Sequence, residues 1–137
     1  MRISSPDGRS FLEWNTPGPA ITGPLAVTGT IQSEVLRGEL TGTFAREEAD
    51  RFAYELRAVM SGRSNAAVLD SLSEDELRVT VLTPDITGVV VVHIAYQSRR
   101  PIGARPFESS YSTGFGISGD ALKDLADGFA RWAATGR

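Results

Sequence analysis

Hydrophobic residues change their spacing along the chain, and this change constrains the fold more than any other feature of the sequence. Between residues 25 and 44 they alternate with polar residues, a period of two that is typical of half-buried strands. A turn near Ser33 and Glu34 divides this stretch into two strands, which we expect to pair as a hairpin. From residue 45 to 61 the spacing becomes three and four residues, which predicts an amphipathic helix.

Strand-type spacing returns in the second half of the chain. Strong strands are expected at "LRVTVL" and "GVVVVHIAYQ", joined by a hairpin turn at "TPDITG". The segment "RRPIGARP" is predicted to be a loop and "FESSYSTGFGI" a further strand. Two shorter segments complete the pattern: a short strand over residues 11–14, and a connector at "SNAAVLDSLSEDE" with room for one helical turn.

The last element is predicted to be a second amphipathic helix. One side of it carries four apolar side chains, Leu122, Leu125, Phe129 and Trp132. The predicted fold class is therefore α+β: a mostly antiparallel sheet of about five to six strands with two amphipathic helices, in the order strands, helix, strands, helix. We expect the 137 residues to form a single domain, residues 1–137.

Composition narrows the class of protein further. Hydrophobic residues make up 41% of the chain and charged residues 23%, which is the globular range. The net charge of −3 is a poor match for a nucleic-acid binder, and the longest apolar run is too short to span a membrane. The sequence starts without an apolar signal segment and contains no cysteine, so we expect a cytoplasmic protein without disulfides or thiolate metal sites.

Three glycines before the last helix, Gly114, Gly116 and Gly119, have the spacing of a dinucleotide-binding loop. Such a loop requires a parallel strand after its helix, and an acidic residue about 20 positions on that holds the ribose. Here the strand leading in follows a hairpin, and no second strand is expected after the helix, so no nucleotide cofactor is predicted. We interpret Gly114 and Gly116 as allowing a bend or bulge in a strand, with Ser118 or Gly119 beginning the helix.

His93 is the only histidine, so a Ser-His-Asp device or a histidine general base would have to use it. It alternates on the same face as Val89, Val91 and Ala95, and if that face is covered, His93 is a hydrogen-bonded structural residue. No second histidine or ligand-spaced carboxylate set accompanies it, so no metal site is predicted. A pair of catalytic carboxylates stays open as an alternative, because such pairs meet only in three dimensions.

Acidic side chains are the most suggestive polar feature. They form two groups: Glu74, Asp75 and Glu76 before a strand, and Asp120, Asp124 and Asp127 along one side of the last helix. Either group alone is typical of a solvated face, whereas together they would present a negative field to a basic partner. Trp14, beside a proline-rich loop, is either a core residue or an interface anchor, and Trp132 is predicted to be core.

The chain also resembles a known family. The run from Leu36 to Gln97, followed by a strand and "SGDALKDLADGF", resembles the WapI-like immunity proteins of bacterial polymorphic toxin systems and related uncharacterised actinobacterial domains. The matching positions are Asp50, Phe52 and Leu56 of a "DLxxFxxxL"-like helix, Leu69, the hairpin Leu77–Tyr96, and Asp120 with Leu122. The aromatic "DQTYL"-type segment of that family is replaced here by "SGDAL".

The resemblance implies a small cytosolic protein that neutralises a toxin domain by binding it and has no catalytic activity. Many such toxins are basic nucleases, for which an acidic patch is a suitable counterpart. The expected partner is therefore a protein, bound through the two acidic groups and Trp14. Two alternatives stay open: a structural or regulatory protein-interaction domain, and a small enzyme that uses carboxylates near His93.

Overall fold

The structure is a computed structural model that describes residues 1–15, 24–72 and 76–134. Its strands form two antiparallel sheets of four strands each, in which chain order and spatial order agree. Sheet A contains β1 (Arg2–Ser4), β2 (Phe11–Asn15), β3 (Leu25–Gln32) and β4 (Arg37–Phe44). Sheet B contains β5 (Ala66–Asp70), β6 (Glu76–Leu82), β7 (Val90–Ile102) and β8 (Arg105–Ile117). Helix α1 (Arg46–Met60) follows sheet A, and helix α2 (Gly119–Ala134) follows sheet B.

The predicted α+β class, the antiparallel pairing and the order of strands and helices are confirmed. The strands divide between two sheets, however, and do not form a single sheet of five to six. Each run of consecutive hairpins pairs within itself, and α1 carries the chain from one run to the other. The hairpin of β3 and β4 turns at Ser33, whose N–H donates to the carbonyl of Leu36 at 2.8 Å, as the sequence predicts.

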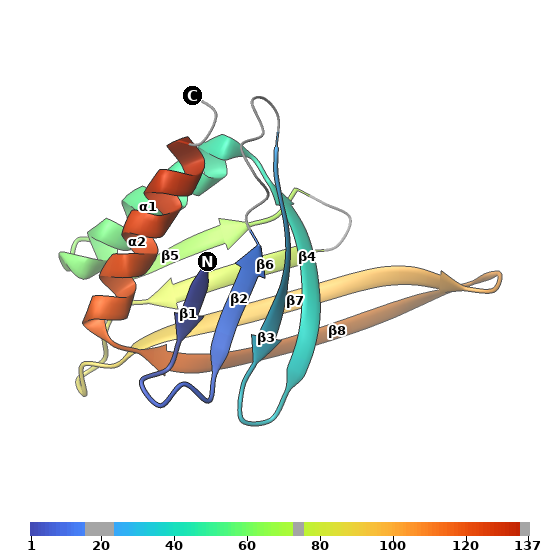
Figure 1. Ribbon diagram of the computed structural model, residues 1–137, viewed down its shortest axis with the longest axis horizontal. Coiled ribbons are helices and arrows are strands. Elements are labelled where there is room, and N and C mark those ends of the chain that lie inside the picture. The colour runs from blue at the N-terminus through green and yellow to red at the C-terminus, as the bar shows by residue number, and fades with distance from the viewer. Residues whose placement is uncertain (16–23, 73–75, 135–137) are drawn as a thin grey trace.

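The two helices pack against each other along one side of the sheets (Figure 1). There α1 contacts β5 and α2 contacts β1, so the helix pair lies next to one edge of each sheet. Near the end of β4, the N–H of Leu72 donates to the carbonyl of Thr43 at 2.6 Å, which ties the link after β5 to sheet A. Apolar side chains of both sheets and both helices therefore form one buried cluster. Neither helix, within the described ranges, is both long and apolar enough to cross a membrane.

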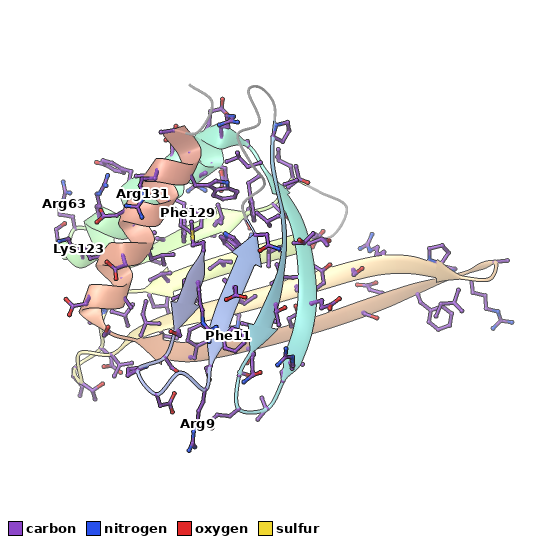
Figure 2. All side chains as sticks on the ribbon, viewed as in Figure 1. Arg9, Phe11, Arg63, Lys123, Phe129 and Arg131 are labelled. Carbon is purple, nitrogen blue, oxygen red and sulfur yellow. The ribbon has the colours of Figure 1, made fainter. Side chains whose placement is uncertain are left out.

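Five aromatic rings fill the part of this core next to the helices: Trp14, Phe44, Phe52, Phe129 and Trp132. In Figure 2, Phe129 lies on the side of α2 that faces the sheets. Trp132 is a core residue, as predicted. Trp14 is only 2% exposed, so the interpretation of Trp14 as an interface anchor is wrong. Its indole packs against Phe44, Phe129 and Trp132 because β2 directs it inward, toward the helices.

The junction between β8 and α2 agrees in part with the sequence analysis. The Ser118 hydroxyl accepts a hydrogen bond from the N–H of Ala121 at 3.2 Å, so Ser118 caps the helix as predicted. A bend or a bulge is predicted at Gly114 and Gly116, and the continuous pairing of β7 with β8 excludes the bulge. Gly114 and Gly116 allow close packing. An added Cβ at Gly114 would lie 3.0 Å from the carbonyl oxygen of Val92, and an added Cβ at Gly116 would lie 2.8 Å from a methyl group of Val89.

Two segments that the sequence assigned to loops are strands. The connector after α1 contains β5, whose buried Ala67 and Leu69 are too few to give a clear period. The segment "RRPIGARP" continues β7 and β8 to a tight turn at Gly103 and Ala104. Gly103 has a φ of +62° and Ala104 does not have a positive φ, which is the pattern of a type II′ hairpin turn.

Candidate partner-binding groove

The acidic residues of α2 do not form one uniform exposed surface. Asp120 and Asp124 are exposed, as the sequence analysis expects. Asp127 lies near α1, where its carboxylate is 3.5 Å from the guanidinium of Arg57. This side chain therefore contributes to the contact between the helices, and its charge is partly balanced there.

One residue of the second acidic group, Glu76, lines a groove on sheet B. Glu76 is exposed at the start of β6, whereas Glu74 and Asp75 lie outside the described residues. The groove has a volume of about 830 Å³ and is lined by all four strands of sheet B: Asp70, Ser71, Glu76, Leu77, Arg78, Ala95, Tyr96, Gln97, Ser110, Tyr111 and Ser112. Most of these residues alternate with buried neighbours, so the groove lies mainly on the face of sheet B that is turned away from the core.

The floor of the groove is built from cross-strand neighbours. Asp70, Arg78, Ala95 and Ser112 lie opposite one another on β5, β6, β7 and β8. The Nε of Arg78 donates to Asp70 at 2.7 Å, and this hydrogen bond raises the pKa of the guanidinium, which stays charged. Because Asp70 and Arg78 balance each other, Glu76 supplies the remaining charge among the described lining residues, and the groove is acidic at that end.

His93 lies on the exposed face of sheet B, and the two residues paired with it across the strands are not carboxylates. Its side chain is exposed because β7 turns Val92 and Ile94 toward the core. His93 and Val91 lie on the opposite face of the strand. Its neighbours across the strands are Thr80 and Gly114. The condition under which His93 would be a structural residue, a covered face, is therefore not met. Among the described residues, no three His, Cys, Asp or Glu side chains lie close enough together to hold a metal ion.

Beyond the groove, the β7–β8 hairpin extends past both sheets as an arm, residues 97–110 (Figure 1). β6 pairs with β7 only as far as Gln97, so the rest of the arm consists of two strands. Residues 101–110 are all exposed. The tip carries Ile102 at 65% exposure and Phe107 at 49%, beside a small hollow of about 320 Å³ lined in part by Arg99 and Arg105. The arm therefore presents both apolar surface and positive charge to solvent.

The base of the arm is fixed to sheet A by two tyrosines. The rings of Tyr96 and Tyr111 pack together with their centroids 5.3 Å apart. The Tyr111 hydroxyl donates to the carbonyl of Glu39 at 3.1 Å, and its ring lies against Gly38 of β4. A hydrogen bond of 2.7 Å between Thr113 and Ser33 adds a second link. These contacts hold the groove and the base of the arm in one position.

The tyrosine at this base gives a testable dependence of stability on pH. Burial raises the pKa of Tyr111 to about 12, with a smaller contribution from Tyr96. Because an unfolded tyrosine ionises near pH 10, the neutral phenol stabilises the fold below about pH 10, and this contribution is lost as the pH rises toward 12. We expect Tyr111→Phe to lower stability at pH 8 and to flatten the loss between pH 10 and 12, measured as the urea midpoint against pH. Parallel curves for the two proteins would contradict this assignment.

Sequence reasoning found one end of the groove and missed the rest. Glu76 was singled out by its charge, but Asp70, Gln97, Ser110 and Ser112 are common polar residues on separate strands. One signal in the sequence could have predicted the full length of β7 and β8. It is the two-residue turn at Gly103 and Ala104, which allows both flanking strands to continue. Comparison of the chain with known protein families, with curated proteins and with solved structures finds no match.

Proposed function

We propose that this protein is a non-catalytic binding protein that neutralises a bacterial toxin domain in the cytoplasm by direct binding. The observation that carries the proposal is that Asp70, Ser71 and Glu76 line the groove, and that Glu76 directly follows Glu74 and Asp75 in the sequence. The resemblance to WapI-like immunity proteins supplies the class of partner. The groove would receive a basic segment of that partner beside Glu76.

The geometry of the groove suits recognition. Its floor is an antiparallel sheet on which Asp70 is paired with Arg78 and the next two side chains, Ala95 and Ser112, are small, so little side-chain freedom is lost there when a partner binds. A negative rim accelerates the encounter with a basic surface and disfavours acidic competitors. An acidic groove of this kind discriminates by charge and shape and needs no chemical step.

The proposal requires a secreted toxin encoded beside the gene for this chain, and the test uses the domain of that toxin that this chain would bind. In the test variant, Glu74, Asp75 and Glu76 are all changed to lysine, and association is measured by stopped-flow fluorescence at several salt concentrations. We expect the association rate constant to fall by about tenfold to a hundredfold at low salt, and protection of cells to be lost, because the field at the groove is reversed.

The matched control changes Asp120 and Asp124 to lysine. These two carboxylates are exposed, but they lie on α2 and do not line the groove. We expect the control to bind the toxin domain at close to the parent rate. If the control loses binding and the groove variant keeps it, the partner binds at α2 and the groove proposal fails.

A further inference from the structure

Sheet edges present unpaired backbone groups, and this fold covers the edge of β5 with side chains of α1. Glu55 accepts from the N–H of Val68 at 3.1 Å, and Arg51 donates to the carbonyl of the same residue at 3.2 Å. Glu48 accepts from the N–H of Asp70 at 3.2 Å. Arg51 also forms ion pairs with both glutamates, so the three side chains act together. This edge is closed to another strand.

Two further edges are also protected. On β4, the carbonyl of Glu39 accepts from the Tyr111 hydroxyl, and the carbonyl of Thr43 accepts from the N–H of Leu72. On the opposite side of sheet A, β1 has only three residues, and a short edge strand offers little to pair with. The fourth edge, β8, differs from these three protected edges.

The turn at the tip shows which residues of β8 face outward. Ile102 and Arg105 flank the two-residue turn and are therefore a hydrogen-bonded pair. The next pair, Pro101 and Pro106, has no N–H to donate, which agrees with the alternation. From there on, every second residue of β8 directs its backbone groups away from β7: Glu108, Ser110, Ser112, Gly114 and Gly116.

This outward series is open to solvent. Glu108, Ser110, Ser112 and Gly114 are exposed, and no strand of the described chain pairs with this side of β8. At 13 residues, β8 is one of the two longest strands in the fold. A long unprotected edge with small side chains is a site for the addition of another strand.

We propose that β8 pairs antiparallel with β8 of a second copy of this chain, joining the two copies of sheet B into one continuous sheet. Centred on Ser112, this pairing sets Glu108 of each copy opposite Gly116 of the other, so no like charges face each other. Arg105 then lies beside the start of α2 in the second copy, where Asp120 is exposed. This charge complementarity selects a second copy as the occupant.

The same pairing accounts for the exposed features of the arm. Phe107 would lie opposite Ile117 of the second copy, at the end of its core, and would lose its exposure to water. Each arm would gain a third strand, and three paired strands are more stable than an isolated two-stranded hairpin. The two grooves would lie on the same face of the joined sheet, with Ser110 and Ser112 of both copies at its centre.

The test is the mass of the purified protein in solution, measured by sedimentation velocity over a range of concentrations. We expect a dimer in equilibrium with monomer at micromolar concentrations. Ser112→Arg sets two positive charges opposite each other at the centre of the pairing and should raise the dissociation constant about tenfold or more. His93→Arg adds the same charge to the same exposed face of the central strand β7 and should leave the dissociation constant nearly unchanged.

A charge exchange tests the register. Arg105→Glu should weaken the dimer, and combining it with Asp120→Arg should restore it, because the ion pair between the copies is then re-formed with opposite polarity. Circular dichroism checks that each variant is folded. A parent protein that stays monomeric, a Ser112→Arg variant that dimerises as well as the parent, or a double variant that gains nothing over Arg105→Glu would overturn the proposal. No toxin is present in this measurement, so its failure would leave the groove proposal standing.

Discussion

Replacing Phe129 with alanine is expected to lower the free energy of unfolding by about 3 to 5 kcal/mol, the range for losing a buried aromatic ring. Phe129 is completely buried on the inner side of α2. Its ring packs edge-on against Phe52, with centroids 4.8 Å apart, and against Trp14 at 5.5 Å. The substitution therefore removes contacts to both α1 and sheet A. A domain of ordinary stability would lose a large part of its free energy of unfolding.

Urea denaturation of the parent and the variant, monitored by tryptophan fluorescence, measures this loss. Phe129→Leu is the matched control, because it keeps most of the apolar volume and should cost clearly less. Lys123→Ala, on the exposed side of the same helix, should change stability by about 0.5 kcal/mol or less (Figure 2). Equal midpoints for parent and Phe129→Ala would contradict the packing described here.

Gly29→Ala is expected to be the most damaging substitution of a small residue, costing about 3 kcal/mol. Gly29 lies opposite Trp14 in the pairing of β2 with β3. An added Cβ would be 2.3 Å from the carbonyl oxygen of Glu13 and 2.8 Å from the Cβ of Trp14. The nearest obstacle is backbone, so β2 itself would have to move, and the indole of Trp14 would leave its position among the core rings.

A second glycine provides the control for this effect. Gly119 begins α2, and an added Cβ there would meet nothing within 4 Å. Gly119→Ala should therefore be neutral or raise stability by up to about 1 kcal/mol, because alanine loses less backbone freedom on folding. Both variants can be compared by their thermal midpoints. If Gly29→Ala and Gly119→Ala had the same thermal midpoint, β2 and β3 would be less closely packed than described.

Hydrophobic period predicted the elements that bury one clear face. The hairpin from residue 25 to 44 and both helices follow it, because their apolar residues recur often enough to define a period. β5 escaped prediction because it buries only Ala67 and Leu69, and because side chains of α1 hydrogen-bond to its edge. That contact joins residues far apart in the sequence, so no local pattern reports it.

The candidate site was harder to predict for a related reason. Charge alone drew attention to Glu76, and Trp14 drew attention because an aromatic residue beside a proline-rich loop suits a core or an interface equally well. Whether Trp14 is a core residue or an interface anchor depends on which face of β2 is covered. That face is covered by α2, which lies more than a hundred residues later in the sequence. The groove itself exists only once four strands are paired in register.

The most direct measurement of the proposed function is hydrogen–deuterium exchange of this protein, alone and with the toxin domain that the proposal requires beside its gene. Amides that become buried against a partner exchange more slowly, so the protected peptides locate the interface. We predict slower exchange in the peptides that contain residues 70–78, 95–97 and 110–112, which line the groove, and unchanged exchange in α2. Protection restricted to α2 would contradict the account. So would the absence of any protection when the toxin domain is shown to be folded and active.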